Sequence, residues 1–305
     1  MLTTGTVRGS GTDLYYERRG DGQPLLLVVG GGGDHGYYDG LADSLADEFT
    51  VLTYDRRGNS RSVLHGSPRP LVMREQSADA LAVLDANDVE AALVFGNSGG
   101  ASIALDLAAR HPDRVNAAVV HEPPVPAVLP DPGPYLAVYD EMDRLLAASG
   151  WTAAFSYFQV TVGRVSPEVS AVMLDPGPHM PAGPLRELLL RVSQNWEYMT
   201  RYEIRSFIDY RPDLDAIAAN GTPVALAQGA DTDDPEAIQM TQATAARLGA
   251  ESVVFPGGHT GPIEVPDAFG PVLRRLLHRL WPAKNGLSAP PRRPPRSRPP
   301  ARPRR

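Results

Sequence analysis

Short runs of apolar residues alternate along the chain with longer segments in which apolar residues recur at helical spacing. Six runs have the continuous apolar character of strands that are buried on both faces, at residues 24–30, 50–55, 91–97, 116–122, 223–229 and 251–257. Helical patterns lie between and after them, at residues 39–47, 74–87, 99–111, 235–248 and about 266–281. The alternation predicts an α/β fold with a mostly parallel sheet flanked by helices.

Two regions depart from this alternation. Residues 5–20 predict an antiparallel hairpin at the sheet edge, with its turn near Gly9–Gly11. About 100 residues separate the run ending at Glu122 from the run beginning at Pro223, and structureless loops of that length are uncommon in compact domains. Aromatic-containing helical patterns fill this gap near residues 135–149, 151–162, 184–199 and 201–209. They predict an inserted helical lid.

The pattern therefore divides the chain into four parts. These are a first core part at residues 1–122, the helical lid at 123–212, a second core part at 213–282 and a tail at 283–305. The tail alternates proline pairs with arginines and cannot form a packed core, which predicts disorder. The tail is basic although the formal net charge of the chain is −7. The rest is therefore acidic, and we expect no nucleic-acid partner for the folded domain.

Composition excludes several further classes. The chain is 42% hydrophobic, enough for a sizeable core, yet no run reaches the roughly 18 apolar residues of a membrane span. The first 20 residues lack the apolar segment of a signal peptide. Cysteine is absent, which removes disulfides, thiolate metal sites and a cysteine nucleophile. We expect a cytoplasmic protein without a membrane partner, and leave its oligomeric state open, with a homodimer as one option.

A Gly-x-Ser-x-Gly motif occupies residues 96–100, between an apolar run and a helical pattern. In this setting the serine lies on a sharp turn that holds its hydroxyl above the sheet. Side chains two residues before and after it would clash, which explains Gly96 and Gly100. The pattern predicts Ser98 as a catalytic nucleophile.

A serine nucleophile needs a general base, and a neutral imidazole suits pH 7. His259 lies just after the last predicted strand, in the segment Phe-Pro-Gly-Gly-His. This places it at the carboxyl edge of the sheet, where α/β proteins bind their ligands. His111 precedes a proline at a predicted helix end and is more simply a capping residue. The sequence therefore predicts His259 as the base.

Two carboxylates compete to orient the base. Glu122 ends the strand after the nucleophile strand, and Asp231 follows the next one, with Asp233 and Asp234 beside it. A glutamate at the end of an apolar strand is costly to bury without a partner, and a catalytic imidazole would supply one. The aspartates could instead cap the helix that begins near Pro235. We favour Glu122 and keep Asp231 as the alternative.

The tetrahedral oxyanion of acyl transfer needs two hydrogen-bond donors. The backbone N–H of Gly99, next to Ser98, is the first candidate. The second should come from the glycine loop at residues 30–33, where we favour Gly31 over Gly32 because glycine allows close backbone approach. The loop does not match the dinucleotide or phosphate motifs. No metal and no organic cofactor is expected.

These motifs resemble those of the α/β-hydrolase superfamily over residues 5–281, including the segment Tyr-Asp-Arg-Arg-Gly-Asn-Ser at 54–60. Within it the chain looks like the zearalenone lactonases and related bacterial serine hydrolases. The resemblance implies that Glu122, in the segment His-Glu-x-Pro, is the catalytic acid. It also implies that Trp196 corresponds to a lid tryptophan that contacts substrate. Two departures are Gly99, where those lactonases often have serine, and a longer insertion. Trp196 could equally serve to pack the interior of the lid instead of contacting substrate.

The resemblance and the motifs together predict a serine hydrolase of the α/β-hydrolase fold. We expect it to cleave a carboxylic ester or lactone of a bulky, largely apolar substrate through an acyl-enzyme. The same residues would serve perhydrolysis or the hydrolysis of thioesters or carbon–carbon bonds. A non-catalytic small-molecule binding protein on this fold, or an interaction protein acting through the basic tail, are the alternatives from other classes.

Overall fold

The computed structural model describes residues 2–177 and 180–282, so the predicted disordered tail lies outside the described residues. A nine-stranded sheet runs in the order β1-β2-β4-β3-β6-β7-β8-β9, with β5 paired to β2. Its strands are β1 (Thr3–Gly9), β2 (Thr12–Arg19), β3 (Gln23–Val28), β4 (Phe49–Tyr54), β5 (Val63–Leu64), β6 (Ala92–Asn97), β7 (Val115–His121), β8 (Val224–Gly229) and β9 (Glu251–Phe255). The six predicted parallel strands and the edge hairpin are all confirmed.

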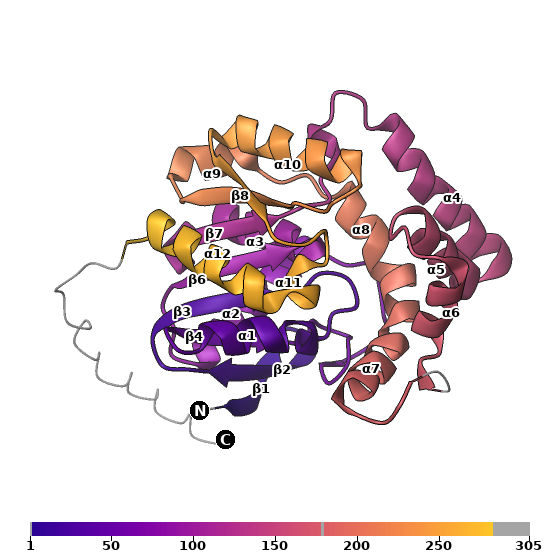
Figure 1. The fold of residues 1–305 in the computed structure, drawn as a ribbon, viewed down its shortest axis with the longest axis horizontal. Helices are drawn as coiled ribbons and strands as arrows, with labels where there is room; N and C mark the ends of the chain where they lie inside the picture. Colours follow the sequence, from indigo (N-terminus) through magenta and orange to yellow (C-terminus); the bar gives the residue numbers. More distant parts are fainter. Residues whose placement is uncertain (1, 178–179, 283–305) are drawn as a thin grey trace, which may run out of the picture.

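Helices cover both faces of this sheet (Figure 1). They are α1 (Asp39–Leu45), α2 (Met73–Ala86), α3 (Gly99–Arg110), α9 (Leu214–Asn220), α10 (Pro235–Leu248), α11 (Gly261–Glu264) and α12 (Pro266–Leu280). Apolar residues of α2, α3, α9 and α10 form one core with the sheet, and those of α1 and α12 form a second core on the opposite face. Every residue of β4 and β6 is buried, which explains why these strands are mostly apolar.

The segment after β7 forms a helical insert, which we define as residues 123–212. It contains α4 (Gly133–Ser149), α5 (Trp151–Thr161), α6 (Pro167–Leu174), α7 (Pro184–Tyr198), a π-helical turn η5 (Met199–Glu203) and α8 (Ile204–Asp209). The insert has an apolar core of its own and lies beside one end of the sheet (Figure 1). The sequence pattern missed the short helices α6, α9 and α11, which have 8, 7 and 4 residues and carry little periodicity. No described helix is long and apolar enough to cross a membrane.

Candidate active site

Ser98 lies on the turn between β6 and α3, in a conformation that L-residues rarely adopt (φ 56°, ψ −126°). A Cβ atom on Gly96 would lie 2.2 Å from the carbonyl oxygen of Gly100, and one on Gly100 would lie 2.0 Å from that of Val28. Only glycine fits either position, so the packing around the turn maintains the strain at Ser98. The serine also precedes the N-terminus of α3, where the helix dipole favours negative charge.

Glu122 and His259 meet at the carboxyl edge of the sheet. Glu122 follows β7, and its Oε2 atom lies 2.6 Å from Nδ1 of His259. Its Oε1 atom accepts hydrogen bonds from the Gly229 N–H at 2.8 Å and from the Thr232 hydroxyl at 2.6 Å. The Glu122 side chain is fully buried, whereas His259 is exposed. The carboxylate is therefore fixed from two sides and presents one oxygen to the imidazole.

The electrostatics keep this carboxylate ionised. Burial raises the pKa of Glu122, but the hydrogen bond from His259, the two nearby imidazoles and Thr232 together lower it to about 2. An ionised Glu122 holds the proton of a neutral His259 on Nδ1, which leaves Nε2 free to accept a proton. No hydrogen bond joins the Ser98 hydroxyl to His259 within the described ranges. Such contacts are often long without a ligand.

The competing aspartates have other contacts. Asp234 caps α10 by accepting hydrogen bonds from the N–H groups of Glu236 and Ala237. The Asp231 backbone N–H donates to Gly257 at 3.0 Å, but its carboxylate makes no hydrogen bond to the part of the chain described here. The geometry brings Glu122, and not Asp231, to His259.

Asn97, His121 and Thr232 belong to this site although the sequence reasoning did not select them. The Asn97 amide lies 2.9 Å from Nδ1 of His121 and donates to the carbonyl oxygen of His259 at 3.0 Å. Burial lowers the pKa of His121 to about 4, so the ring is neutral and Nδ1 can accept. The only sequence signal for Asn97 and His121 is that they adjoin Ser98 and Glu122.

The glycine loop lies on the other side of Ser98. A Cβ on Gly30 would lie 3.0 Å from Cβ of Ser98 and 3.1 Å from the Gly99 nitrogen, so the loop passes directly over the nucleophile. The Gly32 N–H donates to Sδ of Met199 at 3.1 Å. The N–H groups of Gly31 and Gly99 have no partner among residues 2–177 and 180–282. The Gly31 N–H can therefore donate to a ligand, whereas the Gly32 N–H is already bonded to Met199.

Trp196 lies in the core of the insert and is 4% exposed. Its indole N–H donates to the carbonyl oxygen of Met173 at 2.9 Å, and its ring stacks on Phe155 with centroids 4.8 Å apart. The ring edge also faces the loop, 3.1 Å from the position of a Cβ on Gly32. The side chain therefore packs within the insert and borders the glycine loop at the same time.

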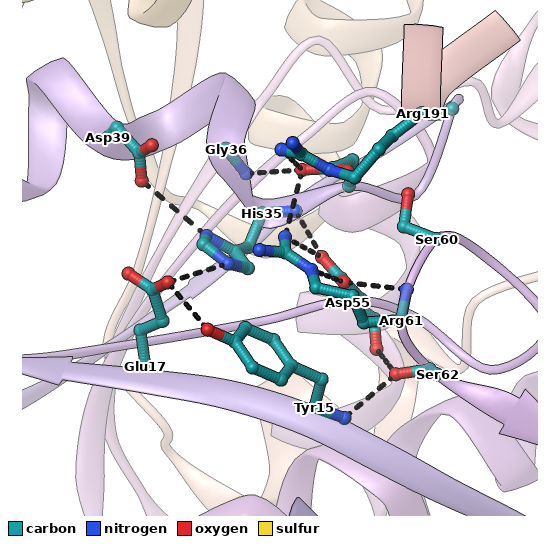
Figure 2. A network of polar contacts seen from close by, with 12 residues as sticks. Tyr15, Glu17, His35, Gly36, Asp39, Asp55, Ser60, Arg61, Ser62 and Arg191 are labelled. Carbon is teal, nitrogen blue, oxygen red and sulfur yellow. Dashed lines mark hydrogen bonds and ion pairs between the residues drawn. The ribbon is translucent and has the colours of Figure 1, made fainter. Parts of the chain in front are cut away.

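A polar network holds the segment that follows the glycine loop (Figure 2). Within it, Glu17, His35 and Asp39 place potential metal-ligand atoms within 4.8 Å of one another. Arg19 already pairs with both carboxylates, at 2.9 and 2.7 Å. Burial lowers the pKa of His35, but its contacts with Asp39 and Glu17 outweigh this and raise it to about 9. A protonated imidazole cannot bind a metal, so these residues fit an ion-pair network better.

Comparison with known proteins places the chain in a family. The family model described as the alpha/beta hydrolase fold matches residues 23–265. An uncharacterized hydrolase, YraK, of Bacillus subtilis is 31% identical over 282 residues, which cover 91% of this chain and 97% of that protein. A zearalenone hydrolase of Bionectria ochroleuca is 30% identical over 278 residues, covering 88% and 96%.

Solved structures agree with this assignment. An alpha/beta hydrolase from Sphaerobacter thermophilus has 28% sequence identity and a TM-score of 0.62, covering 89% of this chain and 99% of that one. An enol-lactonase from Burkholderia xenovorans has a TM-score of 0.65 at 20% identity, covering 90% and 99%, and shows the shared fold alone. The predicted resemblance to the superfamily and to the zearalenone lactonases is confirmed. The chain is thus a hydrolase that belongs to the α/β-hydrolase fold family.

Proposed function

We propose that this hydrolase cleaves a carboxylic ester or lactone through a serine triad. Ser98 is the nucleophile, His259 the general base and Glu122 the residue that orients the base. The observation that carries the proposal is the 2.6 Å contact between Glu122 and Nδ1 of His259 at the edge of the sheet where the strained Ser98 turn lies. The N–H groups of Gly31 and Gly99, which have no partner within the described ranges, complete the machinery as the oxyanion donors.

The reaction proceeds in two halves. Nε2 of His259 takes the proton of the Ser98 hydroxyl while Oγ attacks the carbonyl carbon, and the carbonyl electron pair moves to the oxygen. The tetrahedral intermediate collapses, the C–O bond breaks, and His259 returns the proton to the leaving alcohol. Water then attacks the acyl-enzyme by the same route and releases the acid. Glu122 stays ionised throughout and stabilises the imidazolium.

The substrate proposal rests on the surroundings of the loop. The rings of Trp196 and Tyr37 both lie 3.1 Å from the position of a Cβ on Gly32, so the oxyanion loop has aromatic neighbours on the insert side. Such walls suit a bulky, largely apolar substrate, and the zearalenone hydrolase among the relatives supports a lactone. Residues 123–212 would then act as the lid, with Trp196 contacting substrate through its ring edge. A cytoplasmic location, expected from a chain without cysteine, stays part of the proposal.

A hydrolysis screen tests the function. Zearalenone, simpler lactones and graded aryl esters are offered to wild type and to Ser98→Ala, and a fluorophosphonate probe is used to label the serine. We expect turnover and stoichiometric labelling at Ser98 in wild type, with turnover lower by about 10⁴-fold or more in the variant. An unlabelled Ser98 without turnover of any ester or lactone would contradict the proposal.

Ser102 provides a matched control one turn further along α3. It is fully buried, and its hydroxyl finds no hydrogen-bond partner in the described part of the chain. Ser102→Ala should therefore label and turn over like wild type. A shared loss in both serine variants would point to damage of α3 rather than to the nucleophile.

A further inference from the structure

The oxyanion loop contains four consecutive glycines, Gly30–Gly33. Glycine has no side chain to restrict its backbone, so such a loop samples many conformations unless other groups hold it. Two of the four, Gly32 and Gly33, have positive φ angles of 79° and 63°. An oxyanion donor must keep one direction before the reaction begins. The peptide groups of this loop therefore need external partners.

Arg56 holds the first of these peptide groups. Its Nε and one terminal nitrogen donate to the Gly30 carbonyl oxygen at 3.1 and 2.9 Å. A trans peptide is planar, with its C=O and the next N–H pointing in opposite directions. Fixing the Gly30 carbonyl therefore also fixes the direction of the Gly31 N–H, the donor assigned to the oxyanion.

Arg56 is in turn held by the insert. Glu203 binds it with both carboxylate oxygens, at 2.7 and 2.8 Å, and the side chains of both residues are completely buried. The Phe207 ring lies 5.3 Å from the guanidinium. A buried ion pair of this kind is sustained only with good geometry and further hydrogen bonds, which the Gly30 carbonyl helps to supply.

The insert also holds the next two peptide groups directly. Met199 accepts the hydrogen bond of the Gly32 N–H through its sulfur at 3.1 Å. The Asn195 amide donates to the Gly32 carbonyl oxygen at 2.6 Å and to the Ser60 hydroxyl at 2.8 Å. Three successive peptide groups of the loop are therefore each contacted by a side chain, in addition to the hydrogen bond from the Gly33 N–H to the Gly30 carbonyl oxygen at 3.3 Å.

The three insert residues share a regular spacing. Asn195, Met199 and Glu203 are four positions apart, and the segment from Met199 to Glu203 is a π-helical turn. Every fourth residue of an α-helix drifts around the axis because a turn has 3.6 residues. The wider turn offsets this drift and keeps Glu203 facing the core. Such turns occur frequently at functional sites.

We propose that Arg56, Met199 and Asn195 are positioning residues that aim the Gly31 N–H at the oxyanion, so that the insert sets the rate of acyl transfer. The inference rests on the proposed function, because it takes Gly31 as an oxyanion donor. These residues act through the loop and need not touch substrate. Their effect should therefore appear in the transition state and be absent from substrate binding.

Met199→Leu is the sharpest variant, because it removes the sulfur acceptor and nearly preserves volume. Loss of a whole oxyanion donor costs about 10²–10³-fold in kcat, so loosening one should lower kcat by about 10-fold with KM unchanged. Met199→Gln, which restores an acceptor of similar reach, should recover part of the loss. Met142→Leu is the matched control, because Met142 is equally buried in the insert core and should keep the wild-type kcat.

A trifluoromethyl ketone, which forms a tetrahedral adduct with the serine, provides a second measurement. Its affinity should weaken in Met199→Leu by the same factor as kcat/KM, while inhibition by the acid product stays at the wild-type level. Fluorophosphonate labelling counts competent sites and separates the two proposals. An unlabelled wild type would contradict the triad. A fully labelled Met199→Leu enzyme with wild-type kcat, or one whose defect lies only in KM, would overturn the positioning role.

Discussion

The two halves of the candidate site are held in different ways. On the acid–base side, Glu122 lies directly after β7, and His259 lies four residues after β9. The partners of Glu122 are Gly229, which ends the neighbouring strand β8, and Thr232, three residues further on. On the oxyanion side, the glycine loop follows β3, but Met199 and Asn195 come from the insert. The sheet positions the first half, and the insert completes the second.

Sequence separation does not explain this difference. Glu122 and His259 are 137 positions apart, and Gly32 and Met199 are 167 apart. What differs is the element that joins the residues. A parallel sheet brings strand ends to one edge, whereas the insert contacts depend on individual side chains such as Met199 and Asn195. The sheet therefore accounts for the contact between Glu122 and His259, and the insert accounts for the contacts to the glycine loop.

We expect the largest loss of kcat from a substitution in the acid–base half of the site. Glu122→Gln keeps the shape but loses the charge that stabilises the His259 imidazolium, so kcat should fall by about 10³–10⁴-fold. Asp231→Asn is the matched control and should stay within about twofold of wild type. Steady-state kinetics on the best ester from the screen provide the measurement. A large loss in Asp231→Asn with Glu122→Gln near wild type would return Asp231 as the acid and remove the contrast between the halves.

Gly99 follows the nucleophile and lies against the insert, so it belongs to both halves of the site. We expect its substitution to have an intermediate effect on kcat. A Cβ at this position would lie 2.9 Å from the Phe207 ring, the same ring that neighbours Arg56. Gly99→Ala should displace either the ring or the donor N–H and lower kcat by about 10–100-fold. Adding Phe207→Leu relieves the contact and should recover part of the loss, which a double-mutant cycle measures. Independent, additive losses would show that the insert does not press on this donor.

The acid–base half was largely accessible from sequence because its residues follow recognisable strands. The nucleophile turn, the loop and the strand ends are short-range patterns, and the fold they predicted is the observed one. Thr232 was missed because its neighbours Asp231, Asp233 and Asp234 carry the more conspicuous chemistry. Nothing local marks a threonine hydroxyl as the partner of a glutamate 110 positions away.

The oxyanion half was accessible only in part. The glycines themselves predict a loop that approaches a ligand, but not which side chains support it. Arg56 belongs to the 54–60 motif without any sign of its partner, and Asn195 and Met199 lie in a helical pattern that marks neither residue. Met199 reads as a core residue, and the π-helical turn that aims Glu203 leaves no signature in the apolar pattern. The family resemblance predicted a substrate contact for Trp196, yet its indole N–H is hydrogen-bonded within the insert. Only packing of the insert against the core reveals these contacts.

We expect the smallest effect at the far end of the oxyanion loop, and we expect it in the stability of the fold rather than in the reaction rate. There His35 lies between Glu17 and Asp39, at 3.3 and 3.5 Å, and its pKa is raised from 6.5 to about 9. A raised pKa in the folded state means that protonated His35 stabilises the fold fully below pH 6.5. This contribution is lost as the pH rises through about 9.

Replacing His35 with glutamine tests this sign. Urea unfolding of wild type and His35→Gln at pH 6, 7.5 and 9.5 should give a difference in unfolding free energy that shrinks as the pH rises, by about 1–3 kcal/mol over the window. The variant acts as its own control for lost packing, because that cost does not vary with pH. A difference independent of pH would mean that His35 is neutral in the fold. The loop's far end would then depend on neutral hydrogen bonds and on the ion pairs that Asp34 and Asp55 make with Arg61 and that Asp34 makes with Arg191 of the insert.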